Sequence, residues 1–379
     1  MEAKTPAPSG WCHRGLVLWN FARPPVSRRD SISLRTGHLH VGNHRDDRMR
    51  RRSFIVLLGT LMTLGPFAAT AERTQRLRRI GVLMTHSNNS EERALTQGFL
   101  DAIQQRLQEL GWIAGRNAEI DIRWAPAESY RMYAAELISL SPDVLIGTNT
   151  PTTKALRDAT QTIPIVFGTI SDPVGTGLIS NLARPEGNLT GFTDFEYSMG
   201  GKWLELPKEI SPNVTQIEFI FNPDAEPFAK HYIRSAQDAA TRLSVTLSTE
   251  GVHNTETLER AIVTLAGAPN GGLIVMPDVF NFYHTRLIAE LAERHRVPAV
   301  YSLPFSAARG GLLAYSTDYT EVYRRSTTYV DRILRGARPA DLSVQQPNKF
   351  DLSINLKTAR ALGLAVPVSL LACADEVIE

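Results

Sequence analysis

The sequence predicts an α/β fold made of two doubly wound lobes. Short apolar runs alternate with longer amphipathic segments along the chain, and this alternation occurs twice, with a break at residues 189–201. Apolar runs of about four to eight residues are typical of buried strands, whereas longer runs with helical spacing are typical of helices. Strands that are separated by helices form right-handed βαβ units, so we expect a parallel sheet in each half.

The first half shows the pattern most clearly in its first predicted helix. Leu95, Phe99 and Ile103 are spaced four residues apart on one face of residues 91–110, and Gly111 follows as a stop signal. The predicted strands of this half are 80–84, 118–123, 144–146 and 165–167, and its predicted helices are 91–110, 130–140 and 152–159.

The second half repeats the alternation after the break. Its predicted strands are 217–221, 245–248, 273–276 and 299–301, and its predicted helices are 228–243, 257–266 and 282–295. Residues 72–379 are long enough for two domains of roughly 100–200 residues each.

Residues 49–71 have the three-part layout of a bacterial export signal. Arginines at 50–52 precede an apolar stretch at 54–67, and the small residues at 69–71 form a cleavage site. The apolar stretch is shorter than the roughly 20 residues that a spanning helix needs. The Arg-Arg-Ser-Phe-Ile run at 51–55 also resembles a twin-arginine signal. We therefore expect an exported, periplasmic protein, through either the Sec or the twin-arginine route.

The position of this signal changes the interpretation of what precedes it. A signal is read at an N-terminus, so we expect translation to start at Met49 and residues 1–48 to be an untranslated or disordered upstream extension. The first 71 residues hold 11 of the 41 basic and 4 of the 39 acidic residues, which leaves 30 and 35 and a net charge of −5. A mildly acidic mature chain gives no electrostatic reason to bind nucleic acid.

Polar side chains follow several predicted strands, at the sheet edge where open α/β folds bind ligands. In the first half these candidates are Thr85, His86, Thr148, Asn149, Thr150, Thr169, Ser171 and Asp172. In the second half they are Asn222, Asp278 and Phe305. The turn at 147–153 opens directly into a helix, whose free N–H groups suit a carboxylate. Helix capping is the alternative role for Thr150 and Ser171.

Aromatic residues gather near the second-half candidates. They are Phe280, Phe282, Tyr283, Tyr301, Phe305 and Tyr315. A polar first half and an aromatic second half would suit an amino acid or a similar small molecule. For any single ring the core is the favoured alternative, except for Phe305, which lies in a loop.

The sequence lacks the catalytic and cofactor-binding motifs that would indicate an enzyme. The sequence has no Gly-x-Ser-x-Gly elbow and no P-loop, and the histidines after residue 71 lack metal-ligand spacing. Ser171 and Asp172 with a distant histidine would be a weak triad. We therefore expect no catalysis, no cofactor and no metal.

Several stretches together resemble a known family. They are Ile-Pro-Ile-Val-Phe at 163–167, Asp-Pro-Val at 172–174, Leu-Ala-Arg-Pro-Glu-Gly-Asn-Leu-Thr-Gly at 182–191, Arg-Pro-Ala-Asp-Leu at 338–342, and the segments 349–359 and 374–379. In this order, the chain resembles ABC-transporter substrate-binding proteins of the tryptophan/tyrosine (aromatic amino acid) type over essentially all of residues 78–379.

The resemblance implies a type I periplasmic-binding-protein fold, with Rossmann-like lobes, a three-crossover hinge and a ligand trapped by hinge closure. It implies a first lobe of residues 72–194 plus about 316–345, and a second of 195–315 plus about 346–379. It places Thr148, Asn149, Thr150, Thr169, Ser171 and Asp172 on one wall; strand order puts Asn222, Asp278 and Phe305 opposite. The implied partners are a small ligand and an ABC permease of the inner membrane, and we expect a monomer.

On this interpretation, the loop at 148–150 holds the ligand carboxylate and Asp278 holds its ammonium group. Two alternatives stay open at this stage: a periplasmic sensor that signals to a membrane receptor, and a secreted enzyme. A regulator of the LacI type shares the fold, but would carry a helix-turn-helix where this chain carries a signal.

Overall fold

The computed structural model describes residues 76–86, 90–224 and 229–379. The predicted export signal at 49–71 and the extension before it lie outside the described residues. Within the described residues, no helix combines the length and the apolar character that crossing a membrane requires.

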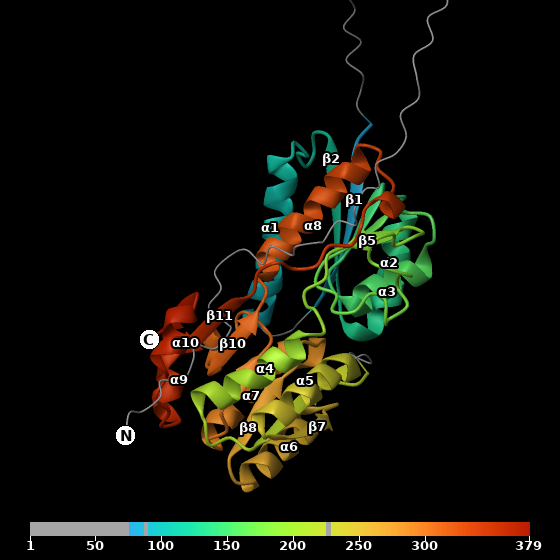
Figure 1. Ribbon diagram of the computed structural model, residues 1–379. Coiled ribbons are helices and arrows are strands. Elements are labelled where there is room, and N and C mark those ends of the chain that lie inside the picture. The colour runs from blue at the N-terminus through green and yellow to red at the C-terminus, as the bar shows by residue number, and fades with distance from the viewer. Residues whose placement is uncertain (1–75, 87–89, 225–228) are drawn as a thin grey trace, which may run out of the picture. The chain divides into compact units, whose positions relative to one another are not determined.

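The first sheet is parallel throughout and has five strands in the order β2-β1-β3-β4-β5. Helices α1 and α8 pack together on one face, and α2 and α3 on the other (Figure 1). The strands are β1 (Arg78–Thr85), β2 (Ala118–Ala125), β3 (Val144–Gly147), β4 (Ile165–Phe167) and β5 (Leu189–Gly191), and the helices are α1 (Ser90–Glu109), α2 (Tyr130–Ser139), α3 (Thr150–Ala159) and α8 (Tyr319–Leu334).

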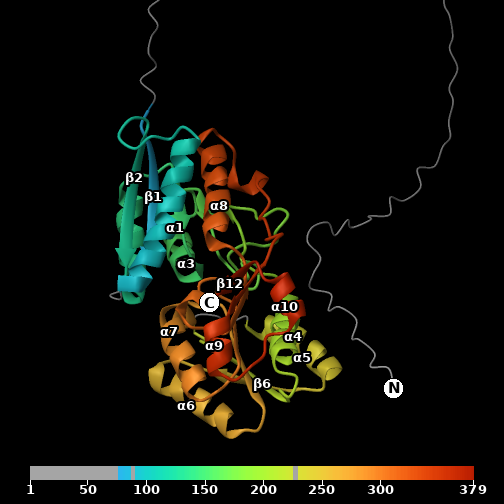
Figure 2. The same ribbon diagram turned by 90° about the vertical axis from the view of Figure 1, so that its left-hand side faces the viewer.

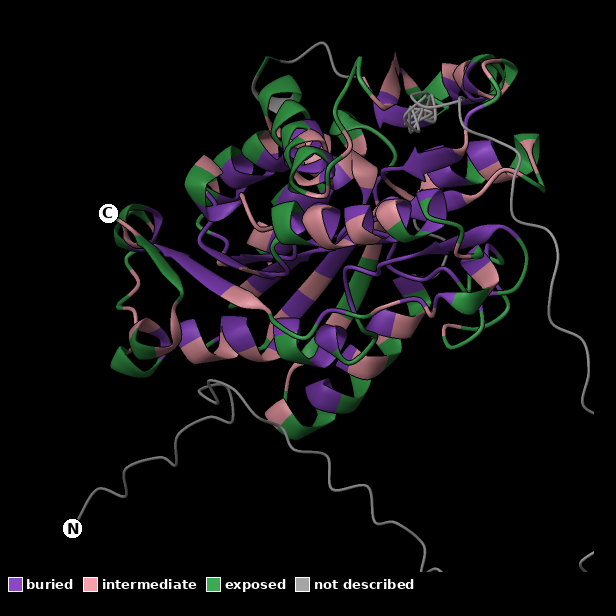
Figure 3. Cartoon of the chain, turned by 90° about the horizontal axis from the view of Figure 1, so that it is seen from above, coloured by how far each residue is buried: buried purple, intermediate pink, exposed green. Residues whose placement is uncertain are grey.

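The second sheet has seven strands in the order β12-β11-β10-β9-β8-β6-β7. Its strands are β6 (Gln216–Phe221), β7 (Thr246–Gly251), β8 (Gly271–Val275), β9 (Ala299–Tyr301), β10 (Leu313–Ser316), β11 (Asp351–Asn355) and β12 (Glu376–Ile378). Its helices are α4 (Met199–Ile210), α5 (Ala229–Leu243), α6 (Thr255–Gly267), α7 (Val279–Arg294), α9 (Leu356–Ala361) and α10 (Val368–Cys373). Figure 3 shows buried residues concentrated on the strands, with exposed residues on the outer faces of the helices.

The predicted strands and helices all form, with ends that shift by a few residues. The elements that the pattern did not indicate are β5, α4 and most of the chain after β9. One pairing departs from the expected parallel arrangement, because β10 and β11 are antiparallel. The reason is topological: the chain leaves β10 at Ser316, passes through α8 of the first lobe, and re-enters the sheet at Asp351, which pairs with Ser316 at the same end.

Three segments connect the lobes. The chain leaves the first sheet after β5 and enters α4, returns after β10 into α8, and passes back to β11 (Figure 1). Figure 2 shows α8 beside α1, apart from α4 and α5. The first and third segments lie side by side: the Thr193 N–H donates to the Gln345 carbonyl at 2.9 Å, and the Gln345 N–H donates to the Gly191 carbonyl at 3.0 Å. The predicted two-lobed, three-crossover fold is therefore confirmed, while the residue boundaries proposed for the lobes stay a prediction.

Gly191 occupies a position where the backbone leaves no room for a side chain. A Cβ atom there would collide with the Phe167 carbonyl oxygen and ring. We expect Gly191→Ala to lower the free energy of unfolding by about 1–3 kcal/mol, the usual cost of overpacking, as measured by urea denaturation. Gly98→Ala on α1 is the matched control, because its Cβ meets nothing within 4 Å, and should be neutral or stabilising. Equal effects of the two changes would contradict the prediction.

Candidate ligand-binding site

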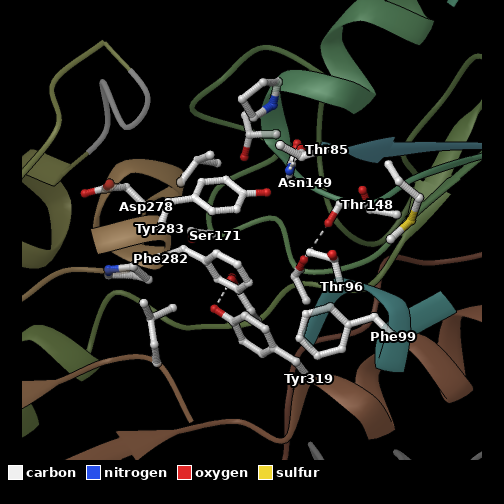
Figure 4. A pocket seen from close by; sticks show the side chains of 18 of the residues that line it. Thr85, Thr96, Phe99, Thr148, Asn149, Ser171, Asp278, Phe282, Tyr283 and Tyr319 are labelled. Carbon is white, nitrogen blue, oxygen red and sulfur yellow. Dashed lines mark hydrogen bonds between the residues drawn. The ribbon is translucent and has the colours of Figure 1, made fainter. Parts of the chain in front are cut away.

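A cavity of about 680 Å³, part of it open to solvent, is lined by residues from both lobes (Figure 4). In the first sheet it lies where the strand order reverses, because β1 lies between β2 and β3 and the lining includes residues at the ends of β1 and β3. In the second sheet the lining residues follow β8 and β9. Such switch points leave a crevice beyond the carboxyl ends of the strands. The lining residues are Met84, Thr85, Thr96, Phe99, Thr148, Asn149, Thr150, Pro151, Thr169, Ser171, Asp194, Pro277, Asp278, Val279, Phe282, Tyr283, Leu303, Tyr319 and Tyr323.

The start of α3 is fixed by a capping box. Asn149 Oδ1 accepts the Thr152 N–H at 3.0 Å, and Thr152 Oγ1 accepts the N–H groups of both Thr148 and Asn149 at 3.1 Å. Asn149 Nδ2 donates to Thr85 Oγ1 at 2.8 Å. Asn149 rather than Thr150 is therefore the N-cap, and most polar groups of this loop are already used by the fold.

Thr150 is the exception in this loop. Within the described part of the chain, neither its backbone N–H nor its hydroxyl has a hydrogen-bond partner, and Thr150 lines the cavity as the first residue of α3. The N-terminus of a helix carries a partial positive charge and points N–H groups outward. Thr150 is therefore the group of the first wall that is best placed to meet an anion.

The neighbouring residues are held by a buried network around one carbonyl. The Thr148 carbonyl accepts hydrogen bonds from Thr169 Oγ1 at 2.8 Å and from the Tyr323 hydroxyl at 2.6 Å. Thr169 adopts a left-handed backbone with φ of +46°, which is unusual for a β-branched residue and is found mainly where the surroundings compensate for it. This network connects β3, β4 and α8 beneath the cavity.

Asp278 lies on the second wall as the N-cap of α7. Its Oδ1 accepts the Asn281 N–H at 2.8 Å, and its Oδ2 accepts the Asn222 N–H at 3.0 Å and Asn281 Nδ2 at 2.8 Å. Burial raises the pKa of Asp278 to about 7, although the N–H groups of Asn281, Asn222 and Phe280 oppose the shift. The carboxylate is thus occupied by donors of its own lobe.

Asp194 is a second buried acid of the cavity, and lies on the first crossing segment. Its Oδ2 accepts the Tyr319 hydroxyl at 3.3 Å, while its Oδ1 has no partner among the described residues. Burial raises the pKa of Asp194 to about 7; its own N–H, that of Phe195, and the hydroxyls of Ser171 and Tyr319 favour the charged form but do not outweigh burial.

Aromatic rings from both lobes line the rest of the cavity. Phe282 of α7 lies 6.5 Å from Phe99 of α1 between ring centroids, and Phe99 lies 5.1 Å from Tyr323 and 6.1 Å from Tyr319 of α8. Tyr283 also faces the cavity (Figure 4). The expectation that only the second half would supply rings is therefore incomplete, because α1 and α8 supply them as well.

The structure brings together most of the predicted site residues. Those that line the cavity are Thr85, Thr148, Asn149, Thr150, Thr169, Ser171 and Asp278. His86, Asp172, Asn222 and Phe305 lie outside its lining. Asp172 Oδ1 accepts the Gly175 N–H at 2.7 Å, Asn222 supports Asp278, and Phe305 packs edge-on against Phe282. Ligand contact by any of them stays a prediction.

Sequence reasoning missed Asp194, Tyr319, Tyr323 and Thr96. Asp194 follows the 182–191 stretch that carries the family resemblance, so that stretch was the available signal. Tyr319 and Tyr323 are four residues apart on a helix that the pattern did not predict, and Thr96 is part of the helix predicted at 91–110, where only the apolar face was considered.

The described lining includes two carboxylic acids and no lysine, arginine or histidine. No group of three or more histidine, cysteine or acidic residues within the described chain could hold a metal ion. The polar groups that face the cavity therefore suit a ligand with a cationic group and an apolar body.

The model of the family described as ABC transporter substrate binding protein matches residues 80–378. The chain belongs to this family. Its members bind ligands rather than catalyse reactions, in agreement with the absence of a catalytic motif in the sequence.

Known relatives agree with this assignment. A tyrosine-binding protein of Clostridioides difficile (strain R20291) is 26% identical over 293 residues, which cover 77% of this chain and 82% of the relative. A conserved domain protein of Vibrio cholerae O1 is 29% identical, with a TM-score of 0.71 and coverage of 80% of this chain and 100% of the other. An ABC domain from Streptococcus pneumonia in complex with L-Trp has the same fold, with a TM-score of 0.72 at 24% identity and coverage of 80% and 100%.

We expect the raised pKa of Asp194 to make the stability of the fold depend on pH. Because the folded-state value of about 7 lies above the ordinary 3.8, protonation stabilises the fold fully below about pH 4, and this stabilisation is lost as the pH rises through about 7. The side chain of Asp194→Asn cannot ionise. The free energy of unfolding of this variant, minus that of the wild type, should therefore rise by on the order of 2 kcal/mol from pH 5 to pH 8.

Urea denaturation of both proteins at the two pH values measures this difference. Asp238→Asn, at an exposed position of α5, is the control and should show no such gain. A pH-independent difference between Asp194→Asn and wild type would contradict the assigned pKa.

Proposed function

We propose that this protein is the solute-binding component of an ABC importer for an amino acid, with an aromatic amino acid as its ligand. The observation that carries the proposal is a single cavity that combines the start of α3, two buried acids and rings from both lobes. An L-amino acid carries the complementary groups: a carboxylate for the helix N-terminus, an ammonium group for an acid and a side chain for the rings. The tyrosine-binding relative supports the aromatic ligand.

The two-lobed arrangement supports binding by hinge closure. A ligand favours a closed state only if it binds that state more tightly than the open one. Here the first wall offers Thr150 and Phe99, and the second wall offers Phe282 and Tyr283, so a ligand in contact with both walls would gain contacts on closure. Hinge closure of domains around a ligand is a common way of coupling binding to a downstream partner.

Export to the periplasm and docking on an inner-membrane permease complete the proposal. They rest on the signal-like sequence at 49–71 and on membership of the substrate-binding family. A periplasmic sensor would use the same cavity. Uptake of labelled amino acid by cells that lack this gene distinguishes the two roles, because loss of a sensor leaves the uptake rate unchanged.

A thermal-shift series tests the ligand class. We expect L-tyrosine, L-tryptophan or L-phenylalanine at a hundred times its dissociation constant to stabilise the protein by about 2.7 kcal/mol, a rise of several degrees in Tm. Ribose and L-glutamate are the controls, because neither offers an apolar body for the rings, and neither should shift the Tm. Failure of every aromatic amino acid to raise the Tm would refute the proposal.

Thr150 is the residue to change for the predicted carboxylate contact. Thr150→Val removes the hydroxyl and keeps the shape, so we expect the affinity for L-tyrosine to fall by about three- to tenfold, in line with one lost hydrogen bond. The affinity for tyramine, which lacks the carboxylate, should not change. Isothermal titration calorimetry measures both, and an equal loss for the two ligands would place the carboxylate elsewhere.

A further inference from the structure

Of the two acids in the cavity, only Asp194 has a buried carboxylate oxygen without a hydrogen-bond partner among the described residues. All the acceptor contacts of Asp278 that were described above go to its own lobe, and they explain its presence as the N-cap of α7. Asp194 is the N-cap of no described helix, and its Oδ2 accepts the Tyr319 hydroxyl. The Ser171 hydroxyl and the N–H groups of Asp194 and Phe195 also favour its charged form. A buried polar atom without a partner costs free energy unless a ligand or water completes it. Asp194 Oδ1 is such an atom, and its residue is 3% exposed.

Within the described part of the chain, no basic side chain is a partner of Asp194. Among the described residues that line the cavity there is no basic side chain, and no described arginine or lysine forms an ion pair with Asp194 at up to 4.0 Å. Buried carboxylates in proteins are normally paired or coordinate a cation. Without a cationic partner, burial favours the protonated acid. A cationic ligand would supply the partner that the ionised carboxylate lacks.

Asp194 also occupies a special place in the chain. It follows directly after the residues of the first crossing segment that pair with the third, and its partner Tyr319 is the first residue of α8, immediately after the second crossing. The acid and its hydroxyl donor thus belong to two of the three connections between the lobes.

We propose that Asp194, held by Tyr319, is the receptor for the primary ammonium group of the ligand, and that this contact anchors the ligand to the crossing segments rather than to the wall of either lobe. The proposal deepens the function proposed above and rests on it. It assigns to Asp194 the role that strand order had suggested for Asp278, and leaves Asp278 as the support of α7. The ligand class is a primary amine with an aromatic body, and an α-amino acid fits when Thr150 meets its carboxylate.

The test compares matched ligands that differ in one group. L-Tyrosine is compared with 3-(4-hydroxyphenyl)propionate, which lacks the ammonium group, and L-tryptophan with indole-3-propionate. Calorimetry on the wild-type protein should show a preference for the amino acid of about tenfold to a hundredfold, the size expected of one charge-assisted hydrogen bond. In Asp194→Asn this preference should largely disappear, while the affinity for the des-amino acid stays the same or improves.

Asp278→Asn is the matched control, because it changes an equally buried acid of the same cavity. It should keep the preference for the amino acid. If Asp194→Asn does not fold, Tyr319→Phe gives the second measurement, since it retains the ring and removes the donor to Asp194; we expect a severalfold smaller preference for the amino acid. An unchanged preference in these variants, or its loss in Asp278→Asn alone, would overturn the proposal.

The outcomes separate the two proposals. If the wild-type protein binds neither amino acid, the proposed function itself fails. If it binds one of them and Asp194→Asn retains the full preference for the ammonium group, only the role of Asp194 fails.

Discussion

Backbone pairing between the first and third crossing segments is the constraint on which the arrangement of the lobes depends. The hydrogen bonds from Thr193 to Gln345 and from Gln345 to Gly191 join two stretches that lie more than a hundred residues apart in sequence. They are reinforced by the Thr190 hydroxyl, which donates to the Leu342 carbonyl at 2.7 Å. Because these segments leave the first sheet together, they fix where the second sheet begins, and therefore where the carboxyl ends of the two sheets meet.

The chemistry of the cavity depends on which polar atoms have no hydrogen-bonding role in the fold and can therefore bind a ligand. Helices that begin at the edge of a sheet need acceptors for their first N–H groups, and here Asn149 and Asp278 provide them. Their side chains thereby lose most of their capacity for a ligand. Thr150 and Asp194 do not cap any described helix. Of the polar groups in the cavity, they are the donor and the acid that remain available to a ligand.

The alternating pattern of the sequence was sufficient to predict the two α/β lobes. It was not sufficient to predict the elements next to the segments that connect them. Strands such as 80–84 and 273–276 are buried on both faces and have apolar sequences, so their order could be predicted. Helix α8 has Tyr319, Tyr323 and Ser326 on its buried side, a mixture that does not produce a clear apolar stripe. The strands β5 (Leu-Thr-Gly) and β12 (Glu-Val-Ile) are as short as the predicted β4 and β9, but they are not continuous apolar runs, so the pattern did not indicate them.

The same limit applied to the candidate site. Rules about strand ends found Thr85, Thr148 and Asp278, because those positions follow from the order of elements. They placed His86 and Phe305 there too, although neither lines the cavity, because a rule about loops does not specify which side chains point inward. Asp194 escaped notice because its importance comes from burial without a basic partner, which only the packed structure reveals.

The rings and the polar groups of the cavity come from different parts of the fold. The rings are on the helices α1, α7 and α8, whereas Thr150 and Asp194 are at a helix start and on a crossing segment. Helix surfaces accept substitutions of similar volume with little cost, but the crossing segments are fixed by backbone pairing. Evolution can therefore reshape the apolar part of the cavity one side chain at a time while the polar part stays in place, which gives this scaffold a simple route to diversify within one chemical class of ligand.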